Sequence, residues 1–249
     1  MKAILNISAY RFVTLSDTAA LRESIRSQAA ELGLKGTVLL AEEGINLVLA
    51  GGHEAVLQFL RWLKADSRFE ALAVKQSESD TVPFGKLLVK VKREIIRMNH
   101  PTIRPAAARA PSVDAATLAR WLQAGHDDAG RPVVMLDTRN AFEVAQGRFS
   151  GAVDCNIAKF SDFPAAALAH RRELEGKTVV SYCTGGIRCE KAALFMADAG
   201  MANVLQLDGG ILNYFEHVGS QHFSGECFVF DAREHLDSSL QPASVNTSL

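Results

Sequence analysis

The sequence contains no long apolar run. Its longest such segments, Thr37–Ala41, Ile45–Ala50 and Thr178–Tyr182, are far shorter than the about 20 residues that a membrane-spanning helix needs. The N-terminal residues also lack the apolar stretch and the small-residue cleavage site of a secretion signal. We therefore expect neither a membrane span nor export, and we predict a cytoplasmic protein.

Cysteine is sparse, with four residues in a chain of 249, and no two of them have the Cys-x-x-Cys spacing of a zinc or redox site. The seven histidines form no His-Glu-x-x-His motif. A chain of this length does not need disulfides for stability, so a reducing compartment is expected. The sequence therefore predicts no metal site and identifies no cofactor.

Strong net charge is also absent, because 27 basic and 28 acidic residues give a formal charge of −1. The charge is unevenly distributed, however. Between residues 84 and 109 only Glu94 opposes a run of basic side chains, which comprises Lys86, Lys90, Lys92, Arg93, Arg97, Arg104 and Arg109. Two interpretations are open: lysines that face solvent and protect a sheet edge, or a track of charges that binds the phosphates of a nucleic acid.

The length and the ordinary composition, with 48% hydrophobic and 22% charged residues, fit two compact domains. In residues 1–96 strands with apolar alternation are separated by two helical patterns. The expected strands are 3–10, 37–41, 45–50, a short one near 71–74 and 86–92, and the expected helices are 17–33 and 56–63. This βαββαβ order with an added strand predicts a ferredoxin-like α+β domain, in which two helices cover one face of an antiparallel sheet.

Residues 97–112 contain three prolines and no apolar periodicity, so they are predicted to be a linker. In residues 113–235 buried strands alternate with helices, which predicts an α/β domain with a parallel sheet and helices on both faces. The expected strands are 133–136, 152–153, 178–182 and 204–207. Residues 236–249 are predicted to be a flexible tail.

Cys183 is the strongest candidate for chemistry, because it directly follows the buried strand 178–182 and ligands of open parallel sheets gather at the carboxyl ends of strands. The loop after it leads into a helix and consists of Thr184, Gly185, Gly186, Ile187 and Arg188. Its two glycines let backbone N–H groups point at the sulfur. We therefore predict a lowered pKa for Cys183 and a sulfur that a substrate reaches. The alternative is a cysteine that only fills core space.

Cys189 has two open interpretations: a second thiol that resolves an adduct on Cys183, or a packing residue of the helix. The next two residues, Glu190 and Lys191, are expected on the helix surface. A protein tyrosine phosphatase loop is disfavoured, because such loops place one residue more between the cysteine and the arginine than this chain places between Cys183 and Arg188. The smaller cradle better suits a sulfur atom carried by the thiol.

Three segments of the second half resemble the rhodanese domain family. Leu136–Arg139 is similar to its acidic-arginine motif, and Leu207–Ile211 is similar to its closing Gly-Gly turn. Glu143 with Gly147–Ala152 resembles its Glu-x-x-x-Gly-His-Ile-x-Gly-Ala motif, with Arg148 in place of the commoner histidine.

Three further segments, all outside those motifs, make the resemblance more specific. Cys183–Ala192, Ala41–Asn46, and Phe228–Asp231 with Arg233 resemble the oxygen-dependent tRNA uridine hydroxylase family, of the UPF0176 type. The resemblance covers nearly the whole chain and implies a ferredoxin-like domain followed by a rhodanese domain. Many relatives continue into a long cysteine-rich extension, whereas this sequence ends soon after Arg233.

The resemblance implies hydroxylation of the wobble uridine of tRNA to 5-hydroxyuridine, with molecular oxygen as co-substrate, tRNA as partner and Cys183 as the essential cysteine. It implies supporting roles for Asp137, Arg139, Gly44 and Asn46, and RNA contacts for Lys86, Lys90, Lys92, Arg93 and Arg97. From the residues alone, Glu42–Asn46 is equally a hairpin turn with a charged tip. Two other functions remain open: a rhodanese-type sulfurtransferase, and an RNA-binding module without enzymatic activity.

Overall fold

The structure, a computed structural model, describes residues 4–242. The chain divides into two compact units, Met1–Arg97 and Met98–Leu249, which are described separately. Within the described residues, no helix is both long enough and apolar enough to cross a bilayer.

The first unit is a five-stranded sheet with the order β4-β1-β3-β2-β5. All neighbouring strands are antiparallel except β2 and β5, which are parallel. The elements are β1 (Ile4–Phe12), α1 (Thr18–Glu31), β2 (Lys35–Ala41), β3 (Gly44–Gly52), α2 (His53–Lys64), β4 (Val74–Ser79) and β5 (Leu87–Val91). This order confirms the ferredoxin-like fold with one added strand.

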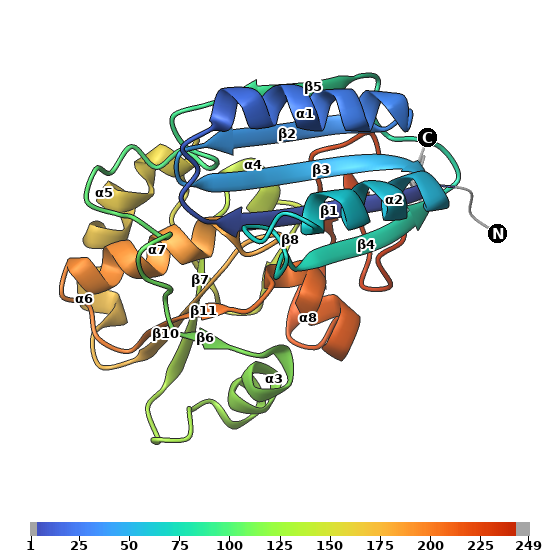
Figure 1. Ribbon diagram of the computed structural model, residues 1–249. Coiled ribbons are helices and arrows are strands. Elements are labelled where there is room, and N and C mark those ends of the chain that lie inside the picture. The colour runs from blue at the N-terminus through green and yellow to red at the C-terminus, as the bar shows by residue number, and fades with distance from the viewer. Residues whose placement is uncertain (1–3, 243–249) are drawn as a thin grey trace. The chain divides into compact units, whose positions relative to one another are not determined.

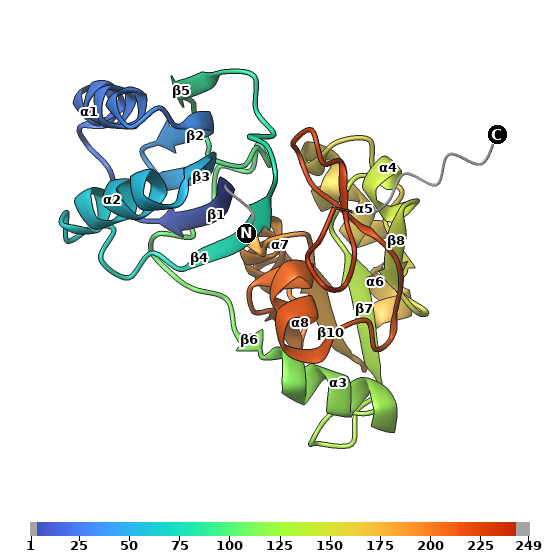
Figure 2. The same cartoon turned by 90° about the vertical axis from the view of Figure 1, so that its right-hand side faces the viewer.

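Both helices lie on the same face of this sheet (Figure 2). They bury apolar side chains against the strands, including Ile25 of α1 and Phe59 of α2. Burial of one such large side chain contributes about 1.5–3 kcal/mol to stability. The predicted strand near 71–74 is wrong in position: Leu72 belongs to the turn after α2 and fills the core, and the strand begins at Val74.

The second unit is built on a parallel five-stranded sheet with the order β6-β11-β10-β7-β9. Its main elements are β6 (Ser112–Val113), α3 (Ala115–Ala124), β7 (Val133–Asp137), α4 (Ala141–Val144), β8 (Gly147–Phe149), β9 (Val153–Asp154), α5 (Phe163–Ala169), α6 (Arg171–Leu174), β10 (Thr178–Tyr182), α7 (Ile187–Asp198), β11 (Val204–Leu207) and α8 (Gly210–Val218). Helices α5, α6 and α7 lie to one side of the sheet, and α3 and α8 to the other (Figure 1). The predicted parallel α/β domain is confirmed.

Short strands close the second unit: β12 (Phe223–Gly225) pairs with β8, and β13 (Cys227–Phe228) pairs with β14 (His235–Leu236). Leu236 is buried, and Asp237 accepts hydrogen bonds from the backbone of Ser239 and Gln241. Residues 236–242 therefore differ from the predicted flexible tail, because their backbone groups are paired. The rest of that prediction, residues 243–249, lies outside the described residues.

Candidate functional site

Cys183 directly follows β10, the central strand of the parallel sheet. Tyr182, the last residue of β10, pairs with Asp137 at the end of β7. The chain then turns through Gly186, whose φ of 99° is a left-handed conformation that favours glycine, and enters α7 at Ile187. The cysteine therefore lies between the carboxyl end of a buried strand and the N-terminus of a helix.

Backbone amides converge on the Cys183 sulfur. The N–H of Gly186 donates a hydrogen bond to Sγ at 3.1 Å, and the N–H groups of Arg188 and Cys189 bond to it as well. The positive end of the α7 dipole points in the same direction. This arrangement stabilises negative charge on the sulfur.

The first turn of α8 is hydrogen-bonded to the backbone of Cys183 and Thr184. The N–H of Ile211 donates to the carbonyl of Cys183 at 2.9 Å, and the N–H of Leu212 donates to that of Thr184 at 3.1 Å. Gly210 has a φ of 68°, and a Cβ there would overlap the Cys183 carbonyl. A residue other than glycine at position 210 would therefore displace the loop around the Cys183 sulfur. From the sequence, Gly210 was identified only as part of the Gly-Gly turn.

The side chains of Cys183 and Cys189 are in different protonation states. Burial opposes ionisation of Cys183, but the hydrogen bond from Cys189, the charge of Arg188 and the amides hold its pKa well below the usual range. Burial and the neighbouring Cys183 raise the pKa of Cys189 far above its usual value. Cys183 is therefore a thiolate beside a neutral Cys189 thiol, whereas burial raises the pKa of Cys155 and of Cys227 to about 12.

Arg188 forms a two-pronged ion pair with Glu143, at 2.6 and 2.7 Å, and both side chains are buried. Glu143 also accepts a hydrogen bond from the N–H of Asn140, which caps α4. The sequence showed Glu143 only as a motif residue, because its partner lies 45 positions away.

Asp137 and Arg139 form a fully buried ion pair at 2.6 Å, and Arg139 also donates to the carbonyl of Gly147. Between them, Thr138 donates to the carbonyl of Tyr182 at 3.0 Å, and its hydroxyl lies 3.7 Å from the Cys189 sulfur. The pair therefore anchors the end of β7 beside the loop.

Cys183 has no exposed surface in this structure, so the expectation of a reachable sulfur is wrong for this conformation. The hydroxyl of Thr184 donates to the carbonyl of Phe228, which links the loop to the β13–β14 hairpin. The placement of Glu190 and Lys191 on the helix surface is also wrong, because both are buried in the first turns of α7. Glu190 forms an ion pair with Arg109 at 3.6 Å.

Gly44 and Asn46 lie in the first unit, at the start of β3. Gly44 has a φ of 147°, and a Cβ there would overlap the carbonyl of Arg11 on β1. The amide of Asn46 donates to the carbonyl of Ile95 at 3.2 Å, and the carboxylate of Glu43 accepts from the N–H of Ile95. These residues hold a hairpin and the chain after β5, and an active-site role for them stays a prediction.

The predicted RNA-binding side chains are all exposed: Lys86, Lys90, Lys92, Arg93 and Arg97. On β5, Leu87 and Val89 pack against the core, so Lys90 lies on the open face of the sheet. The first four form no ion pair with any residue in the part of the chain that the structure describes. Arg109, from the same basic run, is instead paired with Glu190 and Asp208.

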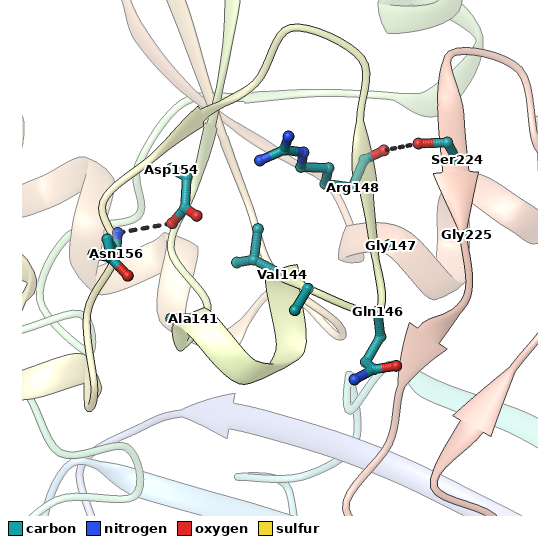
Figure 3. A pocket seen from close by; sticks show the side chains of 10 residues that line it. Ala141, Val144, Gln146, Gly147, Arg148, Asp154, Asn156, Ser224 and Gly225 are labelled. Atoms are coloured by element: carbon teal, nitrogen blue, oxygen red, sulfur yellow. Dashed lines mark hydrogen bonds between the residues drawn. The ribbon is translucent and has the colours of Figure 1, made fainter.

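A separate open pocket of about 500 Å³ lies beside α4, β8 and β12. Asp154 and Asn156 lie on one side of it, and Gln146, Arg148 and Ser224 on the other (Figure 3). None of the residues that line it belongs to the Cys183 loop. Among residues 4–242, no group of three or more His, Cys, Asp or Glu side chains is placed to hold a metal ion.

A ferredoxin-like unit, followed by a parallel-sheet unit whose central strand ends at a cysteine loop, defines the class of protein: a single rhodanese-type domain with an N-terminal ferredoxin-like domain. Residues 4–95 match the family model described as the UPF0176 acylphosphatase like domain, and residues 115–217 match that of the rhodanese-like domain. These matches confirm the resemblance of both halves.

Curated relatives match along nearly the whole chain. The tRNA uridine(34) hydroxylase of Bordetella petrii is 62% identical over 98% of this chain and 96% of its own. Those of Bordetella avium and Variovorax paradoxus are 63% and 58% identical and are covered over 99% and 94% of their lengths. The chain belongs to the tRNA uridine(34) hydroxylase family. These three relatives have little chain beyond the part that matches.

Proposed function

We propose that this protein hydroxylates uridine 34 of tRNA, the wobble base, to 5-hydroxyuridine in an oxygen-dependent reaction. The observation that carries the proposal is the Cys183 sulfur, held as an anion by backbone amides in a chain of the tRNA uridine(34) hydroxylase family. A thiolate is the reactive form of cysteine. Because tRNA is the substrate, the cytoplasm is the proposed location.

The stoichiometry of the hydroxylation shows that the reaction needs a reductant as well as O₂. One atom of O₂ enters the C5–H bond of uracil as a hydroxyl group, and the other leaves as water. This step consumes two electrons and two protons from a reductant. Two thiols that join in one disulfide release that number of electrons, so a thiol is the class of reductant that balances the reaction.

Cys183 and Cys189 are the proposed thiol pair, because their side chains are hydrogen-bonded and only one of them is ionised. Formation of a Cys183–Cys189 disulfide breaks the S–H bond of Cys189 and releases one proton and two electrons to the oxygen step. Solvent supplies the second proton, in place of the one that Cys183 has already lost. An external thiol then reduces the disulfide for the next turnover.

The substrate-binding role falls to the exposed basic side chains on and after β5, namely Lys86, Lys90, Lys92, Arg93 and Arg97. Contacts with phosphates position an RNA without reading its sequence. In the second unit, Asp137 and Arg139 act as positioning residues, because they hold the end of β7 against the strand that carries Cys183.

Mass spectrometry of tRNA nucleosides tests the proposal. Cells that lack the gene are expected to lose 5-hydroxyuridine and its derivatives, wild-type protein to restore them, and Cys183→Ser to leave them absent. A Cys155→Ser variant is the matched control, because Cys155 is also buried but lies on a different segment. Cells blocked in any parallel hydroxylation route are used, so that unchanged nucleosides in the deletion strain reject the function.

A sulfurtransferase is the second candidate, because the same amides that hold the Cys183 thiolate also suit a terminal persulfide sulfur. The Cys183 thiolate takes the outer sulfur of thiosulfate and releases sulfite, and cyanide then removes that sulfur as thiocyanate. Thiocyanate formation at a catalytic rate by the purified protein, without 5-hydroxyuridine formation, favours this candidate over the first.

A further inference from the structure

Two aromatic side chains of the second unit are exposed side by side. Phe142 in α4 is 49% exposed, and Phe230, just after β13, is 60% exposed. No other Phe, Tyr or Trp side chain of residues 4–242 is exposed. Their ring centroids lie 6.4 Å apart at 89°, and Phe228 contacts both rings at 5.2 and 5.1 Å. Exposure of apolar rings to water is unfavourable, so a cluster of two exposed rings indicates a binding surface.

Both rings are linked to the Cys183 loop by residues next to them in the chain. Glu143, adjacent to Phe142, holds Arg188 of the loop with two hydrogen bonds. The carbonyl of Phe228, two positions before Phe230, accepts the hydroxyl of Thr184. The backbone segments that carry Phe142 and Phe230 are therefore both hydrogen-bonded to the Cys183 loop.

The turn that carries Phe230 is held in place. Asp231 accepts hydrogen bonds from the backbone and side chain of Arg233, and both charged groups are nearly buried. The N–H of Val229 donates to the carbonyl of Glu234 at 2.8 Å, which closes the hairpin. A ring that is carried by a held backbone loses less conformational entropy on binding than one on a mobile loop, which favours its use as a stacking surface.

We propose that Phe142 and Phe230 form a stacking platform for a nucleobase of the tRNA anticodon loop, and that this contact positions the base beside the Cys183 loop. The inference rests on the proposed function. Proteins that bind unpaired bases stack them on exposed aromatic rings, because every base has a π face. A protein or membrane partner needs a wider apolar surface, and among residues 98–242 the only other large apolar side chain that is exposed is Leu168 on α5.

Steady-state hydroxylation of tRNA by the full chain tests the platform. Phe142→Leu and Phe230→Leu keep an apolar side chain and remove the ring, so each is expected to raise KM for tRNA about 5- to 150-fold, the range for the loss of one stacked base. Phe230→Trp is expected to keep KM near the wild-type value, because it retains a ring. Leu168→Ala is the matched control for loss of an exposed apolar side chain, with KM unchanged.

A binding measurement separates stacking from a structural effect. The tryptophan fluorescence that Phe230→Trp adds to the signal of the wild type, which contains Trp62 and Trp121, is expected to be quenched by an anticodon stem-loop RNA, and much less by the same RNA without the base at position 34. The pH midpoint of Cys183 alkylation is expected to be unchanged in both leucine variants, which shows that the loop is intact.

The outcomes distinguish the platform from the proposed function. If wild-type protein hydroxylates tRNA and both leucine variants retain its KM, the platform is rejected and the function stands. If wild-type protein makes no 5-hydroxyuridine but the tryptophan is quenched only by the RNA that has the base, the platform stands and the function is rejected. Equal quenching by both RNAs rejects a base-stacking role.

Discussion

The thiol of Cys189 donates a hydrogen bond to the sulfur of Cys183. Because this bond favours the thiolate of Cys183 and the protonated form of Cys189, the pKa values of the two thiols move apart. The first turn of α7 therefore supplies both the amides and a proton donor to a single sulfur. The reactivity of Cys183 depends on this donor as well as on the loop.

Removal of the donor is expected to raise the pKa of Cys183. Thiolate reacts with iodoacetamide and thiol does not, so the rate falls as pH drops below the pKa. In Cys189→Ala the midpoint of the rate is expected to move to higher pH than in the wild type. Cys189→Ser retains a donor, and its midpoint is expected to lie closer to that of the wild type. Site-resolved mass spectrometry measures the rate at Cys183, and equal midpoints in the three proteins contradict the assignment.

Loss of the Glu143 carboxylate is expected to destabilise the second unit strongly. Glu143→Gln leaves Arg188 buried without its counter-charge, which costs roughly 3–5 kcal/mol in the free energy of unfolding. Asp128→Asn is the matched control, because it breaks an exposed ion pair with Arg120 that solvent screens, and it is expected to change the free energy of unfolding far less. Denaturant unfolding measures both. Similar losses in the two variants would be incompatible with a buried, structurally required Glu143–Arg188 pair.

A side chain at position 210 is expected to displace the loop that surrounds the Cys183 sulfur. In Gly210→Ala the new Cβ meets the Cys183 carbonyl at a left-handed backbone position, and strain plus overlap cost roughly 2–4 kcal/mol. Gly125→Ala, at a φ of 79° with open space around it, has the strain alone and is expected to cost about 1 kcal/mol. Activity is expected to fall only in Gly210→Ala. An active Gly210→Ala protein shows that α8 does not hold the loop.

Charge reversal on β5 is expected to weaken tRNA binding. Lys90→Glu replaces an exposed lysine on the open face of the sheet, so affinity falls and its salt dependence becomes shallower, by about 0.7–0.9 in the log–log slope for each lost contact. Lys64→Glu, at the end of α2 on the other face, is the control and is expected to change neither. Filter binding at several salt concentrations measures both slopes. Identical slopes for the two variants remove β5 from the RNA interface.

The sequence was sufficient to predict the two folds and the strand-loop-helix around Cys183. Their signals are local: apolar runs mark buried strands, and the paired glycines mark the turn into α7. The polar strand β4 was misplaced, because its side chains alternate weakly and the apolar Leu72 before it belongs to the core rather than to the strand.

The contacts that tune the site could not be predicted from one sequence. Glu143 meets Arg188 from 45 residues away, and Gly210 meets Cys183 through the packing of α8 on the loop. Tertiary contacts of this kind leave no periodic pattern. Glu190 and Lys191 have polar side chains that predict exposure, yet the packing of α7 in the unit buries them.

The central claim is that the Cys183 thiolate is required for insertion of an oxygen atom from O₂ into uridine 34. Purified protein is incubated with unmodified tRNA, a dithiol and ¹⁸O₂, and the nucleosides are analysed by mass spectrometry. We expect ¹⁸O-labelled 5-hydroxyuridine with the wild-type protein and none with Cys183→Ser. Label-free 5-hydroxyuridine with the wild type, or labelled product with Cys183→Ser, would contradict the claim.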